Sequence, residues 1–178
     1  MERKGTMEVL EAIKTRRSIR AFTDRKISRE DLETIAEAAI YAPSAMNRQS
    51  WKFTVVQDKA RIEALAAAIR KELGRDEGYN FYRPDVMILA SNERDNHNGA
   101  EDCACALENI FLAAHALGIG SVWINQLKGI CDVPDVRAVL RQLKLPENHI
   151  VLGMAALGYP AAPPKQAAKN HSVVEWIL

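Results

Sequence analysis

Basic and hydroxyl side chains cluster near the N-terminus of the chain, where Arg16, Arg17 and Arg20 surround Ser18. A guanidinium group can donate two parallel hydrogen bonds to a phosphate, and a neighbouring hydroxyl can donate another. If the backbone is extended here, side chains alternate between its two sides. Arg16, Ser18 and Arg20 then share one side. Arg17 and Ile19 share the other. The cluster therefore fits a cradle for one phosphate group, and the alternative is a solvated basic turn.

Two glycines, Gly118 and Gly120, could suggest a dinucleotide-binding loop. A Rossmann loop follows a strand, opens a helix and carries a third glycine. Here the two glycines follow a predicted helix, and the third glycine is missing. We therefore interpret them as the end of the helix and the turn after it. The sequence also lacks the lysine motif of a phosphate-binding loop.

Thiols and imidazoles show no metal-ligand spacing. Cys103 and Cys105 fall inside a predicted helix, where residues two apart point to different faces, and Cys131 is remote. We therefore expect structural thiols and no metal site. The same lack of ligand spacing applies to the histidines, which are His97, His115, His149 and His171.

No constellation for nucleophilic or acid–base catalysis stands out. The sequence has no Gly-x-Ser-x-Gly elbow and no convincing pair of a general acid and a general base. A cofactor that carries its own chemistry would make such residues unnecessary. The polar segment Ser91–Gly99 offers oxygen donors but lacks the calcium-loop pattern. We interpret it as a solvated loop or an active-site lid.

Composition narrows the class of protein. The 24 basic and 23 acidic residues leave a formal charge of +1, which argues against nonspecific electrostatic binding of nucleic acid. Three cysteines cannot all pair within one chain and suit a reducing compartment. The polar N-terminus has no apolar signal core, and no apolar run reaches the length of about 18 residues that spans a membrane. We expect a cytoplasmic protein that does not enter membranes.

Periodicity and capping residues predict alternating helices and strands that must position the basic cluster. Ser28 and Asp31 form a capping-box pattern, Gly118 is a helix stop, and Pro134 suits a helix start. The predicted helices lie after a Thr6 cap, at 28–40, 58–73 and 100–117, and from Pro134. The predicted strands lie at 51–56, 85–90, 121–124 and 151–157. The order favours a layered α+β domain.

No repeat or linker divides the chain, so residues 1–178 should form a single domain. Its last residues, Val173–Leu178, are apolar although a polar, proline-containing stretch precedes them. We expect this end to pack on another surface, and a partner subunit is one candidate.

Four segments together resemble the nitroreductase family, in order and spacing, over roughly residues 9–170. They are Arg16–Phe22, Pro43–Trp51, Leu117–Ile124 and Leu157–Pro160. The second segment resembles the family's Pro-Ser-x-x-Asn-x-Gln-Pro-Trp loop, with Ser50 in place of the second proline. The family also uses a basic residue of the tail, commonly arginine, where this chain has lysines.

The resemblance implies an FMN-binding homodimer with its flavin sites at the subunit interface. It also implies a central, mostly antiparallel sheet flanked by helices, with a C-terminal extension that packs on the partner. Arg16, Arg17 and Ser18 should hold the phosphate and ribityl end, and Arg20 the pyrimidine edge. The other implied contacts are Pro43, Ser44, Ala45 and Asn47 from the other subunit, Trp123, Ile124 and Asn125 near the flavin centre, and Lys169, or alternatively Lys165, at the phosphate.

The implied activity is that of an oxidoreductase. NAD(P)H would deliver hydride, leave, and be replaced by a nitroaromatic, a quinone or a similar acceptor, in a ping-pong mechanism without an essential acid or base side chain. The alternative from another class is an FMN-binding protein without turnover, such as a sensor or a storage protein.

Overall fold

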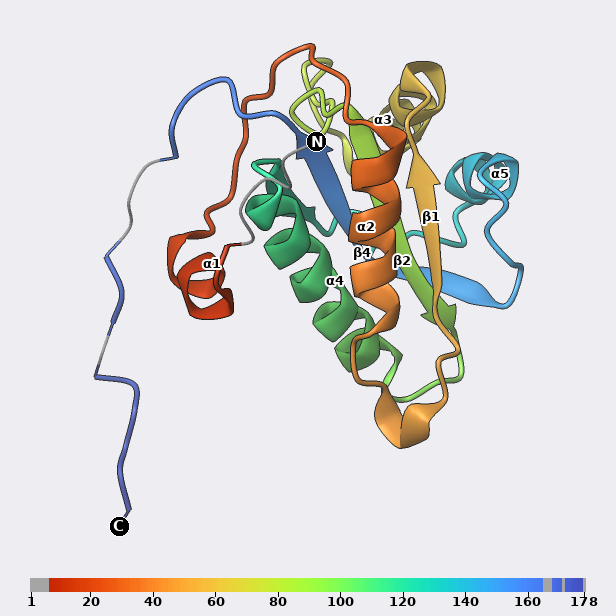
Figure 1. Ribbon diagram of the computed structural model, residues 1–178. Coiled ribbons are helices and arrows are strands. Elements are labelled where there is room, and N and C mark those ends of the chain that lie inside the picture. Colours follow the sequence, from red (N-terminus) through yellow and green to blue (C-terminus); the bar gives the residue numbers. More distant parts are fainter. Residues whose placement is uncertain (1–6, 165–167, 171, 178) are drawn as a thin grey trace.

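The computed structural model describes residues 7–164, 168–170 and 172–177. A twisted sheet lies between two layers of helices (Figure 1). The helices are α1 (Val9–Thr15), α2 (Arg29–Ile40), the short 3₁₀ turn η1 (Ala45–Asn47), α3 (Lys59–Leu73), α4 (Gly99–Ala116) and α5 (Pro134–Gln142). The strands are β1 (Lys52–Val56), β2 (Val86–Glu93), β3 (Gly120–Ile124) and β4 (His149–Gly158).

The sheet has the strand order β1-β2-β4-β3, and every neighbouring pair is antiparallel. The expected α+β fold with an antiparallel sheet is therefore confirmed. The prediction that a loop begins at Ser91 is wrong, because β2 continues to Glu93 after a register shift between Ala90 and Ser91. Ser91 and Asn92 are polar but buried, and their side chains are hydrogen-bonded, so their polarity does not end the strand.

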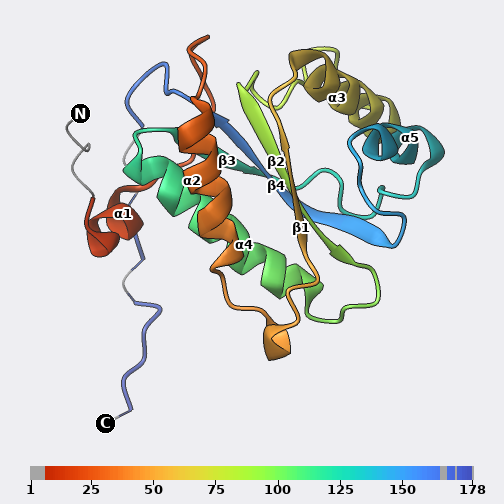
Figure 2. The ribbon, with the colours of Figure 1, turned by 45° about the vertical axis from the view of Figure 1, so that its right-hand side comes forward.

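Helices cover both faces of the sheet, which explains why most residues of its central strands β2 and β4 are apolar. Helices α2 and α4 lie on one face, and α3 and α5 lie on the other (Figure 2). Helix α4 packs closely on β4, where a Cβ atom added to Gly153 would lie 2.6 Å from Cδ1 of Leu107. Glycine at this position therefore allows the close approach of α4 to the sheet.

The helix ends follow the local signals of the sequence. Oγ of Ser28 accepts a hydrogen bond from the backbone N–H of Asp31 at 3.1 Å, Pro134 begins α5, and Gly118 has a positive φ of 73° directly after the end of α4. These three predictions are confirmed. Helix α1 begins at Val9. The predicted Thr6 cap lies outside the described residues.

The cysteine thiols are free and serve packing. Cys103 is buried in α4 and Cys105 is exposed, so the prediction that they point to different faces is confirmed. The buried thiol of Cys131 donates to the carbonyl of Leu127 and accepts from the N–H of Val151, both at 3.3 Å. These bonds join the segment after β3 to the central strand β4.

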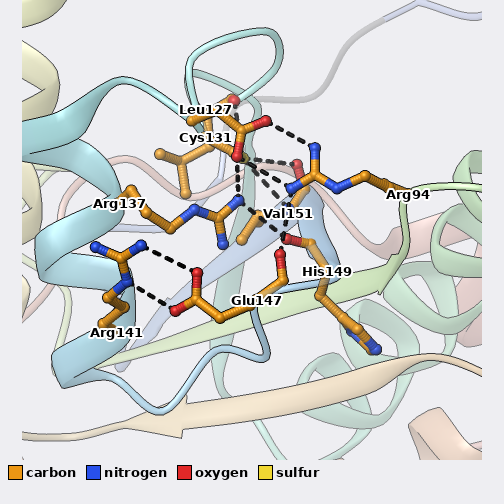
Figure 3. A network of polar contacts seen from close by, with 9 residues as sticks. Arg94, Leu127, Cys131, Arg137, Arg141, Glu147, His149 and Val151 are labelled. Atoms are coloured by element: carbon orange, nitrogen blue, oxygen red, sulfur yellow. Dashed lines mark hydrogen bonds and ion pairs between the residues drawn. The ribbon is translucent and has the colours of Figure 1, made fainter.

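A charged network fastens α5 to the start of β4 (Figure 3). The buried Arg137 donates from Nη2 to Oδ1 of Asp132 at 2.6 Å and to the carbonyl of His149 at 3.1 Å. Arg94 donates from Nη1 to Oδ2 of the same carboxylate at 2.8 Å. Hydrogen bonds from these two guanidinium groups hold the pKa of Asp132 well below its usual range.

This shift predicts a pH-dependent contribution of Asp132 to stability. Because the pKa is depressed in the folded state, the carboxylate stabilises the fold above its unfolded pKa of about 3.9, and the effect is lost as the pH falls through the lower folded value. The urea midpoint of Asp132→Asn should lie below that of the wild type at pH 7, and the gap should narrow toward pH 3. Asp95→Asn, in the adjacent exposed loop, is the control. A gap that stays constant with pH would contradict this assignment.

Candidate functional site

The basic cluster lies on the open edge of the sheet. Helix α1 ends at Thr15, and the extended chain then runs along β3, where Ile19 donates its N–H to the carbonyl of Ser121 at 2.9 Å. The side chain of Ile19 is buried against Gly120, where an added Cβ would lie 2.8 Å from Cγ1 of Ile19. Ser18 and Arg20 are exposed. The predicted alternation is confirmed for Ser18, Ile19 and Arg20, since Ile19 points into the core between two exposed residues.

Arg16 is linked to Trp123, an exposed aromatic residue of β3, by contacts with side chains of α4. Its guanidinium carbon lies 5.9 Å from the ring centroid of Phe111, and its Nε lies 3.7 Å from Oε1 of Glu108. The Phe111 ring in turn contacts Trp123, with centroids 5.8 Å apart. Trp123 remains 41% exposed. A chain of side-chain contacts through the buried Phe111 therefore links Arg16 to the indole of Trp123.

Arg17 has a different local role from its neighbours. Its Nη1 donates to the carbonyls of Lys14 at 2.8 Å and Arg16 at 2.7 Å, which satisfies backbone acceptors at the C-terminal end of α1. Its Nε is buried and has no hydrogen-bond partner among the described residues. A buried donor without a partner is costly, so an anionic or hydroxyl-bearing ligand that accepts from it would be favoured here.

His115 supports the same end of the site, although its spacing in the sequence marked no role. Thr15 donates its hydroxyl to the carbonyl of Glu11 at 2.6 Å, so Nε2 of His115, 2.8 Å from the Thr15 oxygen, acts as the donor to it. Burial lowers the pKa of His115, and the nearby charges of Arg16 and Arg17 lower it further. The imidazole therefore stays neutral beside the arginines.

The end of β3 presents the remaining residues expected near a flavin. Ile124 is buried in the core between the sheet and α3, so only its backbone is available to a ligand, as expected. Asn125 is exposed, and its N–H donates to Oε1 of Gln126 at 3.1 Å. Trp123 and Asn125 are therefore the side chains that the end of β3 exposes beside the basic cluster.

The loop Pro43–Ser50 lies at the opposite end of α4. Ala45 donates its N–H to Oδ1 of Asp102, in the first turn of α4, at 2.8 Å, whereas Thr15 contacts His115 in the last turn. Asp102 and His115 are thirteen positions apart, which corresponds to a rise of about 20 Å. Within one chain the structure thus brings together Arg16, Arg17, Ser18, Arg20, Trp123, Ile124 and Asn125, but not Pro43, Ser44, Ala45 and Asn47.

The described residues of the C-terminal tail are exposed. Lys169 is exposed, and Lys165 lies outside the described residues. The end of the chain extends past α1, away from the sheet (Figure 1). The tail and α1 both expose apolar side chains, namely Val9, Leu10, Ile13, Val173, Val174, Trp176 and Ile177. A shallow groove beside α1 is lined by Met7, Val9, Ala12, Ala38, Asn109, Leu112, Ala113 and Ala116.

Comparison with known proteins places the chain in a family. The model of the Nitroreductase family matches residues 13–159. The chain belongs to the nitroreductase family. A relative from Archaeoglobus fulgidus, provisionally named an NADH dehydrogenase/NAD(P)H nitroreductase, is 38% identical over 86% of this chain and 86% of its own.

Solved nitroreductases share the fold over nearly the whole chain. The FMN-bound nitroreductase of Bacteroides fragilis has a TM-score of 0.91 and 42% identity, covering 97% of this chain and 100% of its own. An FMN-bound nitroreductase of Desulfitobacterium hafniense has a TM-score of 0.84 and 26% identity, covering 96% and 98%. Among the described residues, no helix combines the length and hydrophobicity needed to cross a membrane.

The contacts around the basic cluster predict how the pKa of His115 responds to the loss of a neighbouring charge. The pKa of His115 should lie below the ordinary value of a histidine in the wild type and should rise in Arg16→Gln, because one of the charges that disfavour the imidazolium is removed. Ring-proton NMR over a pH series measures both values. Arg75→Gln, on the far side of the sheet, should leave the His115 pKa unchanged. An unaltered His115 titration in Arg16→Gln would contradict the arrangement.

Proposed function

We propose that this nitroreductase-family chain is an FMN-dependent oxidoreductase. It takes hydride from NAD(P)H and passes electrons to a nitroaromatic, a quinone or a similar acceptor by a ping-pong mechanism. The observation that carries the proposal is the cationic edge at Arg16–Arg20, which extends along β3 and is linked through Phe111 to the half-exposed indole of Trp123. The similarity of the chain to FMN-bound nitroreductases over nearly its full length supports the same conclusion.

The donor set of this edge fits FMN. Arg16 and Ser18 offer a guanidinium and a hydroxyl to the phosphate and ribityl chain, and the orphaned Nε of Arg17 supplies a further donor. We assign Arg20 to the pyrimidine edge, where its charge would favour an anionic ring. Ile124, through its backbone, and Asn125 would lie near the ring centre beside Trp123. Lys169 would add charge at the phosphate.

The bound flavin supplies hydride acceptance and electron transfer, and the protein supplies position and charge. Arg16 is held for this task by Glu108 and Phe111, and His115 donates to Thr15 at the end of α1. No side chain is assigned as an essential acid or base. The chain therefore contributes binding and electrostatics to the reaction.

We further propose that the working form is a homodimer with FMN at the interface. The flavin-binding loop Pro43–Asn47 lies across the length of α4 from the basic cluster, so a second copy must provide it. The apolar side chains exposed on α1 and on the tail would be a liability on a monomer, and two-fold symmetry would let each copy cover the other. Three free cysteines suit the cytoplasm as the location.

Absorbance spectra and steady-state kinetics test this function. The purified protein should be yellow, NADH or NADPH should bleach it under argon, and an added quinone should restore the colour. Initial-rate lines at several acceptor concentrations should be parallel, because one pocket serves the two substrates in turn. Single replacements of His97 or His149 should cost far less than the roughly 10²–10⁴-fold contribution of a general acid or base.

Two results would count against the proposed reaction. A bound flavin that neither cofactor reduces would indicate a flavin-binding protein without turnover. Initial-rate lines that intersect would show that both substrates are bound together.

A further inference from the structure

We infer that four polar side chains, Ser50, Asn92, Asn96 and Asp102, position the loop Pro43–Asn47 for FMN and are thus positioning residues of the flavin site. The inference rests on the proposed function, in which this loop meets the flavin of the partner subunit. It also assigns a role to the segment Ser91–Gly99, which the sequence analysis interpreted as either a solvated loop or an active-site lid.

Asp102 anchors the start of the loop. Its carboxylate is only 4% exposed, and Oδ1 accepts the backbone N–H of Ala45 at 2.8 Å. Oδ2 accepts from Nδ2 of Asn96 at 3.2 Å. A charged acceptor makes a stronger bond to a backbone N–H than a neutral one. The first residue of the 3₁₀ turn is therefore fixed to the first turn of α4, which is rigidly packed on the sheet.

Ser50 anchors the other end of the loop. Its hydroxyl donates to Oδ1 of the buried Asn92 at 2.8 Å and accepts from Nδ2 of Asn96 at 3.1 Å. Asn96 thus bridges both anchors, since the same amide nitrogen also reaches Asp102. The family pattern has a proline at position 50, which stiffens a loop by fixing φ. In this chain, hydrogen bonds from a serine supply the restraint instead.

The loop needs such restraints because its backbone is strained. Met46, Asn47 and Gln49 have φ values of 54°, 52° and 50°, in the left-handed region that side-chain-bearing residues avoid. Strained backbone of this kind persists only where the surroundings hold it. The Met46 side chain is 85% exposed and provides no such support. Anchors at Ala45 and Ser50, on either side of the strained residues, account for the conformation.

The network can be tested by the rate of FMN release from the holoprotein after dilution, followed by flavin fluorescence. Asn96→Ala and Ser50→Ala should each accelerate release by about threefold to tenfold, the effect of losing one or two hydrogen bonds. Asn96→Asp should act more strongly, because it places a second carboxylate against Asp102. Ser50→Thr keeps the hydroxyl and should restore slow release. Asn98→Ala, an exposed neighbour in the same segment, is the matched control.

Thermal unfolding of the flavin-free forms separates positioning from general stability. The network predicts that Asn96→Ala and Ser50→Ala accelerate FMN release more than a variant whose midpoint is lowered equally at a distant site, such as Ile69→Val in the buried face of α3. Release rates equal to the wild type, or faster release that merely follows a lowered midpoint, would overturn the inference. A wild-type protein that binds no FMN would instead overturn the proposed function, so the two failures are distinguishable.

Discussion

The length of α4, which is buried against β4, sets the plan of the proposed site. Its last turns carry Phe111 and His115, which support the basic cluster, and its first turn carries Asp102, which holds the loop proposed to bind flavin. Because a buried helix neither bends nor shortens readily, the basic cluster and this loop stay about 20 Å apart in one chain. The proposed dimer would bring them together and would cover the apolar side chains that α1 and the tail leave exposed.

The edge strand β3 provides the second constraint. An open strand edge is a liability, and here the chain covers it with its own extended segment, pinned by Ile19 against Gly120. The same pinning turns Ser18 and Arg20 outward. Protecting the edge and presenting the cationic donors are therefore two results of one packing arrangement.

Local signals in the sequence were sufficient for much of the fold. The cap at Ser28, the stop at Gly118 and the start at Pro134 depend on neighbouring residues and could be predicted. The supporting residues of the site could not, because the bond of His115 to Thr15 spans 100 positions and that of Asp102 to Ala45 spans 57. Burial of the polar end of β2 likewise depends on tertiary partners. The family resemblance supplied the residues expected to face the cofactor, whereas the structure shows which contacts hold Arg16 and the loop around Ala45.

Complementation between two defective chains tests the shared site most directly. Arg16→Ala damages the basic cluster, and Asn47→Ala damages the loop, so each homodimer should bind FMN weakly. A purified mixed dimer, isolated with two different affinity tags, should contain one doubly damaged site and one intact site. The account predicts one tightly bound FMN per mixed dimer, released as slowly as from the wild type. Weak binding at both sites of the mixed dimer would show that each site is built within one chain and would contradict the account.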